Sequence, residues 1–142
     1  MKLLPRKTIV VPFDFSDHSV AAVDTALEIA DDDSQIHVVH VLQELHVADP
    51  GVVWQTIDND NRAEHATEEM RKRLEGEKYK DVELHIEFGD AGHQISDFAK
   101  QNNCELIVMP SHGRTGIKRL LIGSVAERVV RLSHCPVLVL RS

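Results

Sequence analysis

Hydrophobic residues recur along this chain in short apolar runs separated by longer segments with helical spacing. Apolar, largely β-branched runs that are this short are typical of buried strands. They predict strands at residues 8–11, 35–42, 106–109 and 136–140. Pro12 follows the first run directly, and proline, like the shortness of the run, argues against a helix there.

Residues 82–88 alternate strictly between apolar and polar side chains. The apolar set is Val82, Leu84, Ile86 and Phe88, and the polar set is Glu83, His85 and Glu87. Because successive strand side chains point to opposite faces, one face of this segment is expected to be buried and the other to be exposed to solvent. The pattern predicts a strand at the edge of a sheet.

Between the runs, apolar residues recur every three or four positions, as they do on one face of a helix. This spacing predicts helices at about 17–30, 62–77, 91–102 and 124–132. Ser16 and Asp17 supply capping chemistry for the first helix, and Gly89 and Asp90 open the third. Residues 43–59 show neither the alternation of a strand nor the spacing of a helix, and they contain the turn Pro50-Gly51. We therefore expect a long irregular connection there.

Strands that alternate with helices predict an α/β fold, in which a parallel sheet is covered on both faces. A length of 142 residues with 42% hydrophobic content fits one domain over 1–142. Ligands of such sheets bind beyond the carboxyl ends of the strands, where the strand order reverses. If the first and fourth strands are neighbours, the polar loops that begin at 12–14 and 110–113 share one site.

The charge of the chain is unevenly distributed. The formal net charge is −7, which argues against a dedicated nucleic-acid surface. Residues 111–131 nevertheless carry five basic residues against one acidic residue, a formal balance of +4. An anion that binds this protein is therefore expected to bind there.

Neither a leader nor a membrane segment is visible in the sequence. The first seven residues are basic without an apolar core, and no run approaches the roughly 18 apolar residues of a membrane span. We therefore expect a cytoplasmic protein that does not insert into membranes. Cys104 and Cys135 stand apart from any metal or redox spacing, which favours small buried hydrophobes.

Glycines and positive charge coincide after the fourth predicted strand. Gly113, Gly116 and Gly123 flank a basic loop, and Ser124 begins the last predicted helix. Glycine lets a phosphate oxygen approach the main chain, and a helix N-terminus presents amides without intrahelical partners. The segment is thus a candidate phosphate site.

Together these segments resemble the universal stress protein family, a Rossmann-like branch of the adenine-nucleotide α-hydrolase-like folds. The resemblance covers nearly the whole chain and rests on residues 10–16, 89–90, 111–124 and 135–139. It implies a five-stranded sheet in the order 3-2-1-4-5 and a homodimer joined through the last strand, residues 137–140. In one subgroup it also implies bound ATP, and hence a stress-response or regulatory nucleotide-binding module.

ATP-binding members share the pattern Gly-x-x-Gly, nine residues, then Gly-Ser or Gly-Thr. This chain is similar from Gly113 through residues 114–122 to Gly123 and Ser124, but Pro110 occupies the first glycine position. Proline removes one amide and fixes φ at about −65°, so it could not replace a glycine in a turn that needs positive φ. If the family's glycine serves only the close approach of the nucleotide to the main chain, proline is tolerated there. The sequence leaves both alternatives open.

The resemblance implies a set of nucleotide-binding residues. They are Pro12, Asp14, Val41, Met109, Pro110, His112, Gly113, Arg114, Gly123, Ser124 and Val125. Asp14 is expected near the ribose, Val41 and Met109 near the adenine, and Gly113 and the residues from Gly123 to Val125 around the phosphates. Each position also has a structural alternative: a turn or cap for Asp14, core packing for Val41 and Met109, and an ordinary helix start for Gly123 and Ser124.

Metal and catalytic chemistry follow from the same residues. Mg²⁺ or Mn²⁺ would be held mainly by the phosphates, with Asp14 acting through water. His37 and His40 are three apart on a predicted strand and point to opposite faces, and the other histidines are scattered, so no dedicated zinc site is predicted. His112 is either a phosphate donor or proton carrier, or a solvent-exposed loop histidine.

Hydrolysis has few candidate residues, namely Asp14, His112 and Arg114. The sequence therefore predicts a binding module with at most weak ATPase activity. Two alternatives remain: a dimeric interaction protein of the same fold that acts without nucleotide because Pro110 has closed the pocket, and a slow ATP hydrolase that a partner completes.

Overall fold

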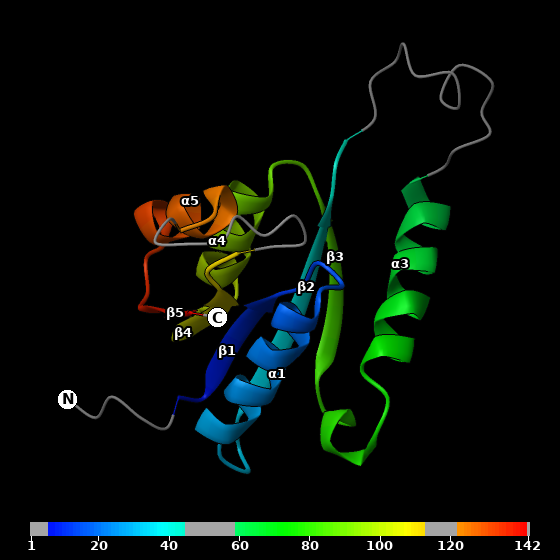
Figure 1. The fold of residues 1–142 in the computed structure, drawn as a ribbon, viewed down its shortest axis with the longest axis horizontal. Helices are drawn as coiled ribbons and strands as arrows, with labels where there is room; N and C mark the ends of the chain where they lie inside the picture. The colour runs from blue at the N-terminus through cyan, green and yellow to red at the C-terminus, as the bar shows by residue number, and fades with distance from the viewer. Residues whose placement is uncertain (1–5, 45–58, 113–121, 142) are drawn as a thin grey trace.

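Parallel strands form one central sheet in this protein, for which the computed structural model describes residues 6–44, 59–112 and 122–141 (Figure 1). The strands are β1 (Thr8–Pro12), β2 (Gln35–Leu42), β3 (Glu83–Phe88), β4 (Leu106–Pro110) and β5 (Val137–Leu140). Their order is β3-β2-β1-β4-β5, and every neighbouring pair is parallel. The predicted fold class and strand order are confirmed.

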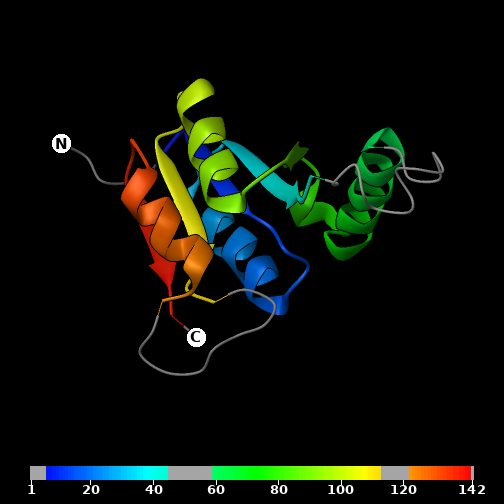
Figure 2. The same ribbon diagram turned by 90° about the horizontal axis from the view of Figure 1, so that it is seen from above.

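Helices cover both faces of the sheet. They are α1 (Asp17–Ile29), α3 (Asn59–Arg73), α4 (Ala91–Gln101) and α5 (Ser124–Leu132), with a short 3₁₀ helix, η1 (Glu77–Tyr79). Figure 2 shows α4 on one side of the sheet and α1 on the other, with α3 beside β3. The chain runs from β1 to β2 on one side of the sheet's centre and from β4 to β5 on the other, so the strand order reverses between β1 and β4.

Two hydrophobic cores result from the alternation of side chains along the strands. In β1, Ile9 and Val11 pack with α1 and α3, whereas Val10 packs with α4 and α5. The core side of α4 consists of Ile95, Phe98 and Ala99. Because both faces of the central strands are buried, their sequences are continuous apolar runs.

Helix α3 differs from its prediction at both ends. It spans Asn59–Arg73 instead of 62–77. The polar residues at its start carry no apolar period, so the pattern could not reveal the first turn. At the other end Gly76, which lies between Arg73 and η1, has a φ of 124°, a non-helical conformation through which a helix could not continue to residue 77.

Strand β3 lies at the edge of the sheet as predicted, but its second face is less exposed than predicted. Leu84 and Ile86 pack on the side of α1 and α3. On the opposite face His85 is half-buried, and its ring lies 4.8 Å from the ring of Phe98 in α4, measured between centroids. The expectation of a wet face was wrong at His85 because α4 extends over the sheet edge.

Two remaining expectations concern the connections and the membrane. The predicted irregular segment falls mostly on residues 45–58, which lie outside the described residues together with its Pro50-Gly51 turn. Among the helices of the described ranges, none has the length and apolar character needed to cross a membrane.

The fold predicts different reactivities for the two cysteines. Cys104 is 3% exposed beneath α4, and burial, with a smaller effect of Cys135, raises the pKa of its thiol to about 12. Because the thiolate is the reactive form, we expect a disulfide reagent at about pH 8 to leave Cys104 unmodified in the folded protein and to modify it after unfolding in guanidinium. Thiol counting on Cys135→Ser, which retains only Cys104, tests this. Rapid reaction of that folded variant would contradict the prediction.

Candidate functional site

The carboxyl ends of β1 and β4 lie side by side, which is the condition for a shared site. These two strands pair directly, with Ile9 opposite Leu106 and Val10 opposite Ile107. Pro12 and Pro110 are the last residues of the two strands. The loops that follow therefore leave the same edge of the sheet at the reversal of strand order.

The loop after β1 is held in one conformation by contacts to β2 and α3. The amide of Phe13 donates to the carbonyl oxygen of Val39 (2.8 Å), and Nδ1 of His40 donates to the carbonyl oxygen of Phe13 (2.7 Å). Phe15 adopts a φ of 68°, and its carbonyl oxygen accepts from Nη1 of Arg73 (2.5 Å). Positive φ is uncommon outside glycine, so these contacts fix a shape that the loop would rarely adopt alone.

Asp14 is half-buried in this loop and has a structural role. Its Oδ1 accepts hydrogen bonds from the amide (3.1 Å) and the hydroxyl (2.5 Å) of Ser16. The turn alternative for Asp14 is therefore present in the structure. Both bonds use one oxygen of a carboxylate that has about four acceptor positions, so the same side chain retains capacity for a ligand hydroxyl.

The two predicted adenine contacts differ in exposure. Met109 is 3% exposed within the core that α4 and α5 cover, so its side chain has the structural role proposed as its alternative. Val41 is half-buried and packs against the same core from the carboxyl end of β2. Of the two side chains, only Val41 offers appreciable surface to a ligand.

Pro110 occupies an extended position. It is the last residue of β4 and pairs with Leu140, and the next amide, that of Ser111, donates to the carbonyl oxygen of Leu140 (2.8 Å). Among the described residues, the positive φ values outside glycine belong to Phe15 and Asn103. Position 110 therefore needs no positive φ, and proline fits the backbone at the cost of one amide.

Gly123 connects the end of β4 to the start of α5. Its amide donates to the carbonyl oxygen of Ser111 (2.6 Å), and a Cβ at this position would lie 2.9 Å from that oxygen. Its φ is −64°, so glycine is required here for close approach and not for backbone freedom. Gly113 and Arg114, also predicted for the site, lie outside the described residues.

The N-terminus of α5 lies beside this contact. Gly123 is the N-cap and provides no side-chain hydrogen bond to the first turn, while Ser124 and Val125 are exposed. The first amides of a helix have no intrahelical partner and carry the positive end of the helix dipole. His112 is half-buried, with its Nδ1 3.1 Å from the hydroxyl oxygen of Ser111.

Part of the positive charge near α5 is neutralised. Arg128 forms an ion pair with Asp90 at the start of α4, and Arg131 lies 3.7 Å from Glu127. The pKa of the Asp90 carboxyl is lowered, chiefly because it accepts hydrogen bonds from His93 and also because it faces Arg128. The other three basic residues of the segment fall outside the described ranges, so within these ranges the helix dipole is the main attraction for an anion.

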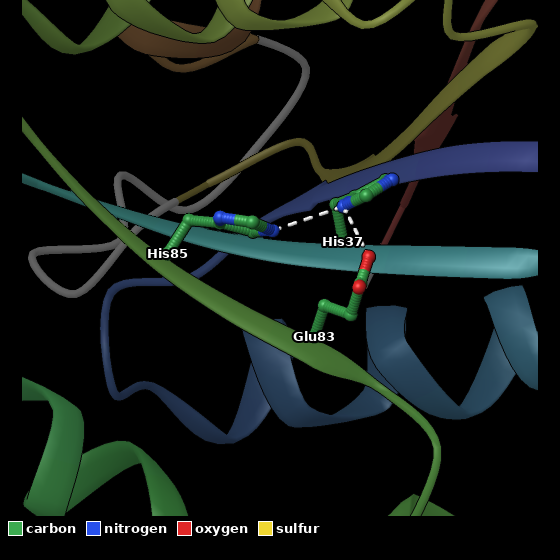
Figure 3. A group of neighbouring side chains, drawn as sticks. All are labelled: His37, Glu83 and His85. Atoms are coloured by element: carbon green, nitrogen blue, oxygen red, sulfur yellow. Dashed lines mark hydrogen bonds and ion pairs between the residues drawn. The ribbon is translucent and has the colours of Figure 1, made fainter.

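A second group of polar side chains lies on β2 and β3 (Figure 3). Nδ1 of His37 is 2.9 Å from Nε2 of His85 and 3.0 Å from Oε2 of Glu83. Burial lowers the pKa of both imidazoles, and the nearby Glu83 carboxylate partly opposes this shift. We call these three residues the β2–β3 cluster.

The β2–β3 cluster could not be found from local spacing. As predicted, His37 and His40 face opposite sides of the sheet, since His37 lies against Phe98 of α4 while His40 contacts the loop after β1. His85 joins His37 through the parallel register, which places Glu83 opposite His37. The available signal was Glu83 and His85 two residues apart on a predicted edge strand.

Comparisons with known proteins agree on one family. Residues 5–141 match the model of the universal stress protein family. The chain is 36% identical over 140 residues to universal stress protein MJ0531 of Methanocaldococcus jannaschii, which covers 95% of this chain and 82% of that protein. It is 30% identical to universal stress protein YxiE of Bacillus subtilis, in an alignment that covers 94% of this chain and 97% of that protein. The solved structure of universal stress protein UspA from Lactobacillus plantarum is similar to this fold, with a TM-score of 0.76 and 29% sequence identity. The match covers 95% of this chain and 97% of that chain.

The Gly123–Ser111 contact predicts a specific cost for adding one methyl group. In Gly123→Ala the new Cβ would press on the Ser111 carbonyl oxygen at 2.9 Å. We expect a loss of about 1–3 kcal/mol in the free energy of unfolding, measured by urea denaturation. Ser124→Ala, a change at the exposed neighbouring position, should stay within about 0.5 kcal/mol of the parent. Equal stability of the two variants would show that the contact imposes no constraint.

Proposed function

The chain belongs to the universal stress protein family, and we propose that it binds ATP, with Mg²⁺ or Mn²⁺, as a stress-response or regulatory module in the cytoplasm. The observation that carries this proposal is the hydrogen bond from Gly123 to Ser111. It sets the N-terminus of α5 at the strand ends where α/β folds bind ligands.

Solved structures with the same fold support the ligand class. One is a universal stress protein in complex with cAMP (TM-score 0.62), and another is the protein from Archaeoglobus fulgidus in complex with dAMP (TM-score 0.58). Both are 22% identical to this chain, a level that establishes only a common fold. In those two proteins the fold accommodates an adenine base, a sugar and a phosphate.

The phosphates would bind at the start of α5. The amides of Ser124 and Val125 are the first of the helix, and both residues are exposed. Gly123 allows an anion to approach the main chain without an intervening side chain. Magnesium keeps most of its waters and needs few protein ligands, so a hard carboxylate oxygen such as that of Asp14 suits it through water.

The ribose and base would bind beside the loop after β1. Asp14 is fixed in its turn by Ser16, and the loop itself is held by His40 and Arg73. A loop that is ordered before binding costs the ligand less conformational entropy. Val41, which is half-buried, supplies apolar surface at the neighbouring strand end.

The described side chains favour binding over turnover. Phosphoryl transfer needs a positioned base and cations around the transferred group. Arg128 is engaged with Asp90, and Asp14 accepts two hydrogen bonds within its own turn. The interaction protein in which Pro110 closes the pocket is less favoured, because Pro110 continues β4 in an extended conformation.

A proline at the first position of α5 tests the phosphate site without a predicted cost in folding. In Ser124→Pro one amide and one hydroxyl are lost, but proline is favoured at the first helical position. The preceding Gly123 already has the extended conformation (ψ 161°) that a following proline requires. We expect micromolar binding of Mg·ATP to the parent protein in calorimetry, without turnover, and at least about tenfold weaker binding to the variant.

The control is Ser124→Ala, which removes the hydroxyl and keeps the amide. If Ser124→Ala loses less affinity for ATP than Ser124→Pro does, the difference is due to the main-chain amide of residue 124. Circular dichroism should show that both variants remain folded. Unchanged affinity in Ser124→Pro, or no binding of ATP at millimolar concentration to the parent, would overturn the proposed site.

We also propose that two copies pair through β5. This strand lies at the edge of the sheet and, among the described strands, pairs only with β4. Apolar side chains are exposed on it and on the adjacent α5: Leu138 (37%), Val130 (49%) and Leu132 (41%). An apolar edge strand tends to be covered, and antiparallel pairing with its own copy gives a closed two-fold dimer.

Sedimentation tests the pairing. We expect the parent protein to sediment as a dimer and Leu138→Asp to sediment as a monomer, because two carboxylates would meet near the two-fold axis without solvent. His134→Asp, which adds the same charge at an exposed position before the strand, should remain dimeric. A parent protein of 16.0 kDa at every concentration would exclude the dimer.

A further inference from the structure

Three electron-pair donors converge in the β2–β3 cluster. His37 presents Nδ1, His85 presents Nε2 and Glu83 presents a carboxylate oxygen, and all three atoms lie within 4.8 Å of one another. Figure 3 shows His37 on β2 facing the two residues of β3. The register explains the convergence, since His37 is opposite Glu83 and His85 follows on the same face.

One proton on Nδ1 of His37 cannot form hydrogen bonds with both of its neighbours in this cluster. Nδ1 of His37 is close to two partners, at 2.9 Å and 3.0 Å, but a ring nitrogen carries either one hydrogen or one lone pair. If it donates to Glu83, it has no lone pair for His85. If it accepts from His85, it has no hydrogen to donate to the carboxylate of Glu83. A cation placed between the three atoms would satisfy all of them together.

From this geometry we propose that His37, Glu83 and His85 bind a divalent transition-metal ion, with Zn²⁺ as the best fit. Zinc bonds of about 2.0–2.2 Å at tetrahedral angles place ligand atoms about 3.3–3.6 Å apart. The separations of 2.9 Å and 3.0 Å need to widen by only a few tenths of an ångström. Water would occupy the fourth position.

The donor set favours this class of metal over others. Imidazole nitrogens suit zinc, copper, nickel, cobalt and iron, whereas Mg²⁺ and Ca²⁺ prefer oxygen ligands throughout. The sheet and α4 already orient both imidazoles, because His37 and His85 each pack against Phe98, at 5.5 Å and 4.8 Å between ring centroids. Glu83 is exposed and gives an ion access from solvent.

The site is separate from the proposed nucleotide site. His37 lies near the amino end of β2, four residues before Val41, which corresponds to about 13 Å along a strand. Metal binding would join the edge strand β3 to β2 by three bonds in addition to their backbone ladder. Because the ion would bind the folded chain preferentially, it should stabilise the fold.

Titration of the metal-stripped full chain with Zn²⁺, without nucleotide, tests the proposal. We expect one ion per chain with micromolar or tighter affinity, and a rise in melting temperature with excess zinc. His85→Gln and Glu83→Gln, both at positions that are not fully buried, should each weaken zinc binding at least about tenfold and abolish the rise. Co²⁺ should report the same site through its visible absorption spectrum.

The matched control is His18→Gln, which removes an exposed histidine from α1. This variant should bind zinc with the affinity and stoichiometry of the parent. Circular dichroism should confirm that every variant is folded. Absence of zinc binding at micromolar concentrations, or binding that His85→Gln and Glu83→Gln leave unchanged, would overturn the proposal whether or not the protein binds ATP.

Discussion

The hydrogen bond from the amide of Gly123 to the carbonyl oxygen of Ser111 is the contact on which the candidate nucleotide site depends. At 2.6 Å it joins the end of β4 to the first residue before α5, and it leaves no room for a side chain at position 123. The positive end of α5 is thereby placed at the reversal of strand order, beside the loop after β1. Local backbone packing thus determines where the proposed phosphate site lies.

Much of the fold could be predicted because local chemistry and tertiary packing agree. The strand at 35–42 and the helix at 124–132 match the structure residue for residue, since apolar runs and helical spacing are unambiguous there. The end of helix α3 was mispredicted because the non-helical conformation of Gly76 excludes an extension to residue 77, a signal that apolar spacing does not contain. His85 was placed on a wet face because the reach of α4 over the sheet edge is a tertiary property.

The candidate site was predictable in position more than in the roles of its residues. The pairing of β1 with β4 confirmed that the two polar loops share an edge. Sequence could not show that Met109 is buried, or that position 110 continues a strand in which proline fits. The β2–β3 cluster was invisible for a related reason, because a contact between residues 37 and 85 depends on strand register and not on spacing along the chain.

An amide NMR titration of the uniformly ¹⁵N-labelled protein with Mg·ATP would locate the nucleotide on the fold directly. If the nucleotide binds where α5 begins, the largest shift changes will be at Ser124 and Val125 and in the loop at Asp14, with little change at the β2–β3 cluster. Changes centred on another part of the fold, or none at millimolar ATP, would contradict the placement of the site.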